Sequence, residues 1–321
     1  MNSIGVIITT YGESKLWEEA VKSVIKQTIN KDITLVLSDD ATPTFNTEIA
    51  YNRIVKLGGK VLKRIIVRKN TKNVGTVKNI NFAAKEINCK YILLLAGDDQ
   101  LYNETVISDY LKLIEDKPEY VAIVGQSLQF SIDMTKAIGV IDSDEVYRKK
   151  FRLLNESGIP LFTALSIKCF IPSSGMMYKK IFLDEIGWFN EDYRLVEDWP
   201  MFLIMAKKKY KIFYSKIIAV KHRVGGVSST NLLARKQLIY QTDLINVIDN
   251  EILNNLKFVE NKKQSLVKQI SREKKIIYEF RYMFSNYNKI NKLKFLIRNL
   301  FLIPIIANRF IRRIKNEEKF I

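Results

Sequence analysis

The sequence predicts an α/β fold in which a parallel β-sheet is covered by helices on both faces. Over the first 130 residues, short apolar runs rich in β-branched residues alternate with segments whose apolar residues recur at helical spacing. Strand–helix units of this length provide the connections that parallel strands require. With 47% hydrophobic and 27% charged residues in 321, the chain has an ordinary globular composition. It can hold two domains, or one large domain with an appendage.

The individual elements follow from these patterns in order along the chain. Five buried strands are predicted at Ile4–Thr10, Ile33–Leu37, Arg64–Arg68, Tyr91–Leu95 and Val121–Gly125. Helices are predicted between them, from Trp17 to Ile25, from Ile49 to the two glycines at 58 and 59, from Val77 to Ile87, and from Glu104 to Glu115.

The segment from 130 to 230 is less regular. Ile171–Tyr178 is typical of a loop that enters a strand. Pro200 favours the start of a helix, so a helix is predicted over Met201–Lys208, with two acidic residues at its N-terminus. Lys221–Ser229 contains two glycines and two serines and is predicted as a loop that can move over a ligand.

Composition excludes several classes of protein. Two cysteines, Cys89 and Cys169, cannot form a disulfide framework, and a single histidine excludes sites with several histidine ligands. The chain contains neither G-x-G-x-x-G nor G-x-x-x-x-G-K-[ST], which makes a dinucleotide oxidoreductase and a P-loop enzyme unlikely candidates. No apolar run is long enough for a conventional membrane span, and the first residues do not resemble a signal peptide. A cytoplasmic location is therefore expected.

Polar residues gather where the predicted strands end. Thr9 lies at the end of the first strand, Asp39 and Asp40 follow the second, and Asp98 and Asp99 follow the fourth. In open α/β sheets, ligands bind beyond the carboxyl ends of the strands. Carboxylates close to the cations of residues 68–72 would suit a divalent metal ion together with a phosphorylated ligand.

Each acidic pair also has a purely structural interpretation. Asp39 and Asp40 could cap the helix that follows them, since aspartate is common at that position. Glu197 and Asp198 could do the same for the helix near Pro200. Two adjacent acids after Leu95 repel each other unless they are exposed or bound to a metal, which favours a metal there. The single histidine, His222, is more often a loop residue than a ligand.

A set of short motifs in a fixed order resembles one enzyme family. In chain order the motifs are VIITTYGE, LVLSDDATP, KNTKNVGTVKNINFAAK, YILLLAGDDQLY, PSSGMMYKK, GWFNEDYRLVEDWP and HRVGGVSS. Together they cover about residues 4–230 and resemble a family-2 inverting glycosyltransferase of the bacterial polysaccharide type. The resemblance implies the GT-A nucleotide-diphospho-sugar transferase fold, which is a Rossmann-like mixed sheet flanked by helices. It implies a catalytic domain over 1–230, with a nucleotide-sugar half (1–125) and an acceptor half (126–230).

The resemblance also implies roles for individual residues. The nucleotide sugar would be bound by Thr9, Tyr11, Glu13, Asp39, Asp40, Lys78 and Asp98. Mn²⁺ or Mg²⁺ would be bound by Asp98, Asp99 and His222. Asp198 resembles the catalytic base, and the acceptor side would include Glu197, Trp199 and Ser174. Three positions depart from the family pattern: Ala96 replaces the first acid of the DXD motif, and His222 and Gly225 replace a closing tyrosine and histidine.

The last quarter of the chain carries more than half of the net charge of +18. Residues 231–321 are predicted to be helical and basic. Within them, residues 289–314 combine an apolar stripe with flanking lysines and arginines. Such a segment suits the surface of an anionic membrane, and it would equally suit packing on the catalytic domain or on a partner subunit.

The sequence therefore predicts a metal-dependent inverting glycosyltransferase. Its donor would be a UDP-sugar, its acceptor a hydroxyl group of a glycan or lipid-linked molecule, and its location the inner face of the bacterial plasma membrane. A nucleotidyltransferase of related fold is the first alternative, although no glycine-rich basic loop follows the first strand. The second is a non-enzymatic basic protein that binds membranes or nucleic acid. The acidic strand ends disfavour nucleic acid, and none is expected as a partner.

Overall fold

The structure is a computed structural model that describes residues 3–12, 14–30, 32–225 and 234–286. Two sets of residues for which the sequence predicts contacts, Glu13 and 289–314, lie outside these ranges.

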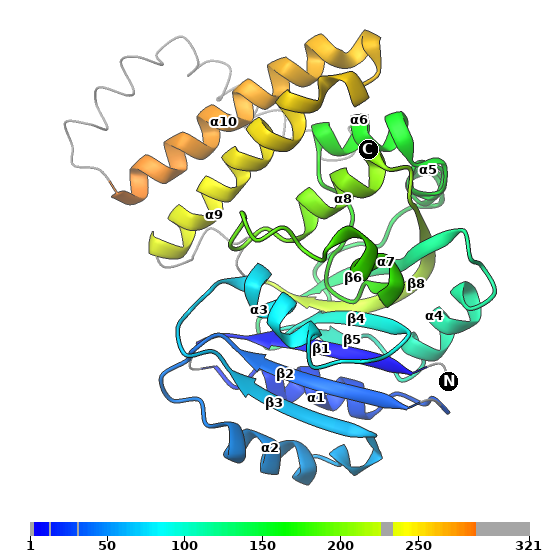
Figure 1. Cartoon of the computed structure of the whole chain (residues 1–321), viewed down its shortest axis with the longest axis vertical. Helices are drawn as coiled ribbons and strands as arrows, with labels where there is room; N and C mark the ends of the chain where they lie inside the picture. Colours follow the sequence, from blue (N-terminus) through cyan, green and yellow to red (C-terminus); the bar gives the residue numbers. More distant parts are fainter. Residues whose placement is uncertain (1–2, 13, 31, 226–233, 287–321) are drawn as a thin grey trace.

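One eight-stranded mixed sheet forms the centre of the molecule (Figure 1). Its strands, in chain order, are β1 (Ile4–Thr10), β2 (Ile33–Asp39), β3 (Arg64–Lys69), β4 (Tyr91–Ala96), β5 (Gln100–Leu101), β6 (Tyr120–Phe130), β7 (Met177–Lys179) and β8 (Lys211–Arg223). Their spatial order is β3-β2-β1-β4-β7-β6-β8-β5. The first four strands are parallel to one another, as the sequence predicts.

Helices cover both faces of the sheet. The α-helices are α1 (Trp17–Ile25), α2 (Thr47–Lys56), α3 (Thr76–Ala84), α4 (Val106–Ile114), α5 (Asp144–Glu156), α6 (Gly158–Ile167), α7 (Lys180–Ile186), α8 (Asp198–Lys207), α9 (Ala234–Asn246) and α10 (Gln264–Asn286). Helices α1, α2 and α4 bury apolar residues against one face, and α3, α6, α7 and α8 bury theirs against the other. Because the strands are covered on both faces, they are apolar almost throughout.

The sheet differs from the prediction in its second half. The short strand β7 lies between β4 and β6 and is antiparallel to both. The predicted fifth strand is longer than expected, and it pairs with β8, a thirteen-residue strand. Strand β8 has two short apolar runs, at 212–214 and 217–220, that Ser215 and Lys216 interrupt, and no strand is predicted there from the sequence. Its last residues, from Lys221 to Arg223, fall within the segment predicted as a loop.

The helices that follow residue 230 share a core with the sheet. Leu244 of α9 and Val247, Ile248 and Ile252, which follow it, are buried in the same cluster as residues of β1, β4 and α8. In Figure 1, α9 and α10 lie side by side at one end of the molecule, next to α8. Within 234–286, the described part of this region, the chain is largely helical and shares its apolar core with the sheet.

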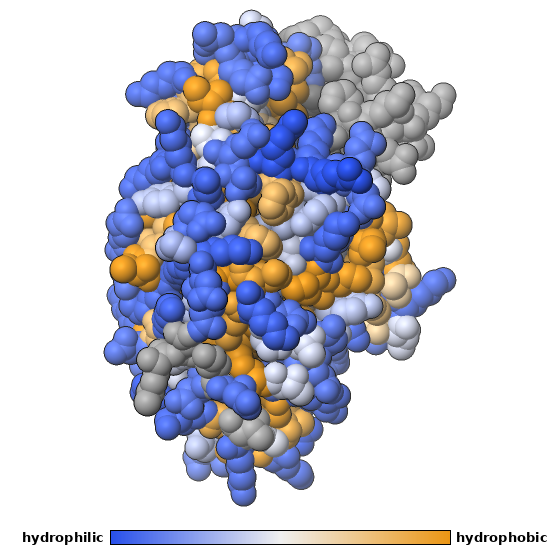
Figure 2. All heavy atoms as spheres, turned by 90° about the vertical axis from the view of Figure 1, so that its right-hand side faces the viewer, coloured by the Kyte–Doolittle hydropathy of each residue, from blue (hydrophilic) through white to orange (hydrophobic). Residues whose placement is uncertain are grey.

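The surface is predominantly polar. On the face in Figure 2, hydrophilic side chains cover most of the area, and apolar side chains gather in a band across the middle. In the part of the chain that the structure describes, no helix is both long and apolar enough to span a bilayer.

Candidate active site

Three neighbouring strands end at the same level and bring the first acidic residues together. Strand β1 lies between β2 and β4, and Thr9 is in register with Ser38 on β2 and with Ala96 on β4. Asp39 and Asp98 follow these residues at the same edge of the sheet. The sequence predicted this arrangement, because parallel strands place their carboxyl ends on one side.

Asp39 holds the chain that leaves β2. Its Oδ1 atom accepts a hydrogen bond from the Thr42 backbone N–H at 2.7 Å, and its Oδ2 atom accepts one from the Thr42 hydroxyl at 2.6 Å. The Thr42 hydroxyl oxygen also accepts from the Gly12 N–H at 2.8 Å. Asp39 is buried, and this burial raises its pKa. The residue thus lies where the loops after β1 and β2 meet.

The carboxylate of Asp40 is used inside the protein. Oδ1 accepts from the Val74 N–H at 2.8 Å and from the Asn70 side chain at 2.9 Å, and Oδ2 accepts from the Gly75 N–H at 2.8 Å. These bonds close the loop between β3 and α3. Asp40 thus shapes this loop, and its contact with a nucleotide sugar stays a prediction.

A polar network beneath this loop was not found by sequence reasoning. Arg68 donates to the Ser38 hydroxyl at 2.6 Å and to the Asn70 amide oxygen at 2.7 Å. Asn79 on α3 accepts from the Ser38 hydroxyl at 2.6 Å. Burial lowers the pKa of the Arg68 guanidinium. The available signal was a pair of asparagines, Asn79 and Asn81, among the mostly apolar buried residues of α3.

Asp99 is the second acidic residue that the structure turns inward. Its side chain is fully buried, and Oδ1 accepts from the Arg223 backbone N–H at 3.0 Å and lies 3.0 Å from Nδ1 of His222. The hydrogen bond with Asp99 is the main reason that the pKa of His222 is raised. In this arrangement Asp99 fixes the end of β8, and its role as the metal ligand that the resemblance implies stays a prediction.

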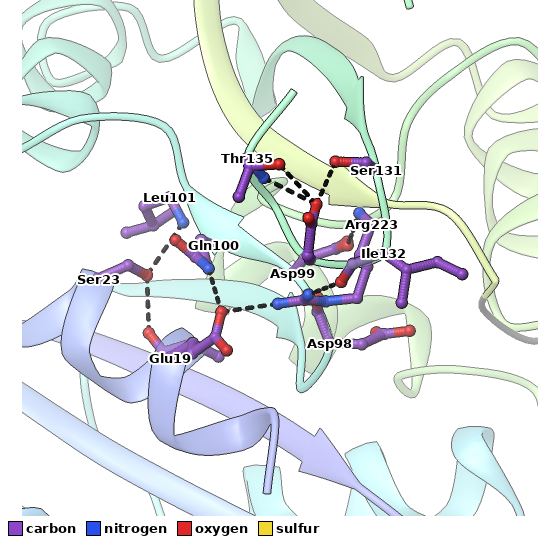
Figure 3. A network of polar contacts seen from close by, with 12 residues as sticks. Glu19, Ser23, Asp98, Asp99, Gln100, Leu101, Ser131, Ile132, Thr135 and Arg223 are labelled. Carbon is purple, nitrogen blue, oxygen red and sulfur yellow. Dashed lines mark hydrogen bonds and ion pairs between the residues drawn. The ribbon is translucent and has the colours of Figure 1, made fainter. Parts of the chain in front are cut away.

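Arg223, the last residue of β8, connects four parts of the site (Figure 3). Its backbone N–H binds Asp99, and its Nε atom donates to the Asp98 carbonyl at 2.9 Å. One terminal nitrogen donates to Glu19 of α1 at 2.7 Å, and the other donates to the Ile132 carbonyl in the loop after β6. The side chain is almost fully buried. Sequence reasoning missed it because its partners lie at least 91 positions away in the sequence, where no local pattern reveals them.

Asp98 remains available for a ligand. Its carboxylate makes no hydrogen bond or ion pair with another residue in the described ranges, and in Figure 3 it points away from the network around Arg223. Burial and the charge of Asp99 raise its pKa, which means that the ionised form lacks compensation. Among the described residues, no group of three or more His, Cys, Asp or Glu could hold a metal ion. One free carboxylate still fits Mg²⁺ or Mn²⁺, since such ions often bind through one or two carboxylates and substrate phosphates.

The second acidic pair lies at the start of α8. Glu197 precedes the helix, and Asp198 is its first residue, as the sequence predicts. Oδ1 of Asp198 accepts from the Trp199 N–H at 2.7 Å. Burial raises the pKa of both carboxyls, and the charge of Asp198 raises that of Glu197 further. A carboxylate with a raised pKa is a better proton acceptor than an ordinary exposed aspartate.

One loop connects the two acidic motifs. In the segment that leads into β7, the Ser173 side chain lies close to Glu197 and partly offsets the rise in its pKa, and the Ser174 hydroxyl accepts from the Ala96 N–H at 3.3 Å. Ala96 is the last residue of β4 and stands two positions before Asp98. Because the two serines are adjacent, the end of β4 and Glu197 lie near each other.

The remaining predicted residues lie in different surroundings. Tyr11 is exposed beyond β1. Lys78 is partly exposed on α3, with its Nζ atom 3.9 Å from Glu191. Trp199 contradicts the acceptor-side expectation: it is 3% exposed, its indole N–H donates to the Leu165 carbonyl at 3.0 Å, and it packs between α6 and α8. Its apolar ring belongs to the core and not to a binding surface.

Comparison with known proteins decides the family. The model of glycosyl transferase family 2 matches residues 5–182, which is more than half of the chain. The chain belongs to glycosyl transferase family 2. A glycosyltransferase of Haemophilus influenzae is 21% identical over 97% of both chains. The O-antigen chain rhamnosyltransferase RfbN of Salmonella typhimurium is 25% identical over 68% of this chain and 66% of its own.

Solved structures confirm the fold. The mannosyltransferase PcManGT of Pyrobaculum calidifontis, in complex with GDP-Man and Mn²⁺, has a TM-score of 0.59 at 12% identity, covering 99% of this chain and 81% of its own. Residues 1–349 of S. aureus TarS, in complex with UDP-GlcNAc, have a TM-score of 0.54 at 18% identity, covering 88% and 81%. The chain spans only 50% of the longer TarS chain, with a TM-score of 0.51. The predicted GT-A fold is confirmed, and the protein is a glycosyltransferase.

Proposed function

We propose that this family-2 enzyme is a metal-dependent inverting glycosyltransferase that moves a sugar from a UDP-sugar to a hydroxyl group. The observation that carries the proposal is the loop before β7, in which the Ser174 hydroxyl accepts from the end of β4 and the adjacent Ser173 lies close to Glu197. In this proposal Asp98 offers a carboxylate suited to a diphosphate-bound cation, and the half-buried pair Glu197 and Asp198 offers one suited to a base. An inverting transfer needs one group of each kind and no covalent nucleophile.

The donor is proposed to bind across the ends of β1, β2 and β4. Thr9, Tyr11 and Asp39 lie along this edge, where the base and ribose would be held, and Lys78 stands on the adjacent helix α3. A UDP-sugar is favoured because the TarS fragment, which has the same fold, is described in complex with UDP-GlcNAc. The complex of the mannosyltransferase with GDP-Man makes a guanosine nucleotide the first alternative to test.

Asp198 is proposed as the base. It stands at the N-terminus of α8, and burial raises its pKa, so its ionised form readily accepts the proton of an acceptor hydroxyl. Glu197 precedes it in the chain, and the charge of Asp198 raises the pKa of Glu197.

Asp98 is proposed to hold the metal, Mn²⁺ or Mg²⁺, with the diphosphate of the donor. When bound, the ion would stabilise the negative charge that develops on the leaving nucleoside diphosphate. Within the chain, Arg223 holds the Asp98 carbonyl, and Asp99 holds the end of β8 beside it. His222 lies next to both acids, and we propose it as a neighbour of the metal rather than as an established ligand.

A glycan or lipid-linked molecule of bacterial surface polysaccharide synthesis is proposed as the acceptor. The Salmonella relative is named as an O-antigen chain rhamnosyltransferase, which supports this class. Exposed aliphatic side chains gather in the loop after β6, at Ile132, Ile138, Val140 and Ile141. Arg223 ties this loop to Asp98. An apolar loop beside the site would suit a lipid-linked acceptor at the inner face of the plasma membrane, with 289–314 as a second contact.

The test begins with a thermal-shift screen of UDP-, GDP- and dTDP-sugars, with and without Mn²⁺. With the donor found, Asp198→Asn should slow nucleoside diphosphate release by about 100-fold, because the base is lost. Binding of UDP and Mn²⁺ should remain. Asp192→Asn is the matched control, since Asp192 is an exposed acid in the same segment. Full turnover in Asp198→Asn would refute the base assignment.

A further inference from the structure

One carboxylate outside the acidic motifs is buried against the segment that leads to them. Asp243 lies on α9 and is 4% exposed. Its Oδ2 atom accepts hydrogen bonds from three successive backbone N–H groups, at 2.9 Å from Arg194, 2.6 Å from Leu195 and 3.2 Å from Val196. Successive N–H groups that converge on one oxygen form a strong site for an anion. The next two residues of the chain are Glu197 and Asp198.

The same segment is fixed from the opposite side by the donor half of the site. The Arg194 guanidinium donates to the Asn73 carbonyl at 2.9 Å and to its side-chain oxygen at 2.7 Å. The Arg194 carbonyl accepts from the Val77 N–H at 3.2 Å. The loop before Val77 is the one that Asp40 closes. Residues 194–196 are therefore held between α9 and the β3–α3 loop.

Helix α9 also passes close to the proposed base. Tyr240 stands one helical turn before Asp243, and its pKa is raised by burial first and then by the charge of Asp198. On α10, the Lys274 ammonium lies 5.0 Å from the centre of the Trp199 ring. Helix α10 thus contacts the start of α8, and among the described residues of α9 and α10 it is Asp243 that accepts from the backbone N–H groups immediately before α8.

We propose that Asp243 is a positioning residue for the catalytic pair, and that α9 is in this way a working part of the active site. By fixing the backbone of 194–196, Asp243 sets where Glu197 and Asp198 stand relative to the bound donor. This inference rests on the proposed function. Small displacements of a catalytic group lower the rate far more than they lower donor binding.

The experiment compares Asp243→Ala and Asp243→Asn with the wild type in the full chain. Thr242→Ala is the control, because Thr242 is exposed on the same helix and its hydroxyl donates only to the Leu238 carbonyl within it. In Asp243→Ala, the amides of 194–196 should exchange with solvent at least about tenfold faster, and kcat for UDP release from the donor should fall about 10- to 100-fold. The Kd for UDP with Mn²⁺ should stay within about twofold. Asp243→Asn keeps an acceptor oxygen and should recover part of kcat.

Two results would overturn the inference. If the three amides exchange in Asp243→Ala as in the wild type, Asp243 does not hold the segment. If they exchange faster while kcat stays within about twofold, Asp243 is structural only. If Asp243→Ala does not fold, the amide exchange rates and kcat of Asp243→Asn decide the question in the same way. Asp198→Asn is run in parallel: full activity there would refute the proposed function, and the exchange data would still decide what Asp243 holds.

Discussion

At the scale of single residues, burial decides the chemistry. Four acidic residues lie at the ends of the strands and helices of the site, and they differ in how many hydrogen bonds they accept. The carboxylates of Asp40 and Asp99 accept hydrogen bonds from backbone N–H groups within the protein. Asp98 and Asp198 lie in the same general region with fewer partners, and burial raises the pKa of each. A buried acid without enough donors costs stability, and such a cost is common where a group is kept ready for a ligand.

Glu197→Gln is expected to stabilise the protein. The pKa of Glu197 is raised in the folded state, so the folded protein binds its proton more tightly than the unfolded chain does. Stability is therefore lost as the pH rises through the folded pKa. The glutamine side chain does not ionise, so the variant avoids this loss of stability, and its unfolding temperature should be higher by about 2–4 °C at pH 8. The gain in stability should vanish near pH 4, where Glu197 of the wild type is neutral like the glutamine of the variant. A pH series of melting curves checks this, and an equal gain at both pH values would contradict it.

At the scale of elements, the sequence predicted which residues the strand ends bring together, but not the direction in which each side chain points. Thr9, Asp39 and Asp98 come together because parallel strands are in register, and apolar runs reveal such strands. Asp99 is turned inward by Arg223, a contact between residues 124 positions apart that no local pattern encodes. Trp199 was misplaced for the same reason, since its partner on α6 is remote in sequence. Strand β7 has three residues and is too short to leave a periodic signal.

Gly75 should be intolerant of a side chain, because the β3–α3 loop approaches Arg194 closely. An added Cβ would stand 2.3 Å from Cγ and 2.5 Å from the carbonyl oxygen of Arg194, and the residue has φ of +93°. Gly75→Ala should destabilise the protein by roughly 1–3 kcal/mol through overpacking and backbone strain. Gly187→Ala is the control, because its φ is +80° but nothing lies within 4 Å of the added Cβ. Urea unfolding measures both, and equal losses would mean that the close approach contributes nothing.

At the scale of the whole molecule, the catalytic unit does not stop at the end of β8. Leu244, Val247, Ile248 and Ile252 are buried in the core that also contains residues of α3, α6 and α8. The boundary near residue 230 that the sequence suggested follows a change in charge. Charge is a property of the surface, and it does not report which apolar residues are shared inside.

A chain that ends at residue 230 is therefore expected not to fold. Burial of each aliphatic side chain contributes about 1.5–3 kcal/mol, so loss of four of them rivals the whole stability of a typical domain. A chain that ends at residue 286 keeps all of the described core and should unfold cooperatively. Circular dichroism and thermal melting of the two truncated chains compare them. A cooperative transition in the shorter chain would show that the C-terminal helices are dispensable for folding.

The adjacency of Ser173 and Ser174 has a consequence for how the enzyme can diversify. Ser174 binds the end of β4 and Ser173 lies close to Glu197, so in the proposed function one peptide unit helps to set the gap between the metal-binding acid and the acidic pair. Inserting or deleting one residue between them would change that gap by about 3.5 Å, more than the tolerance of a displacement reaction. Variation in sugar and acceptor would then have to arise in the flanking loops, while this dipeptide stays constant in length.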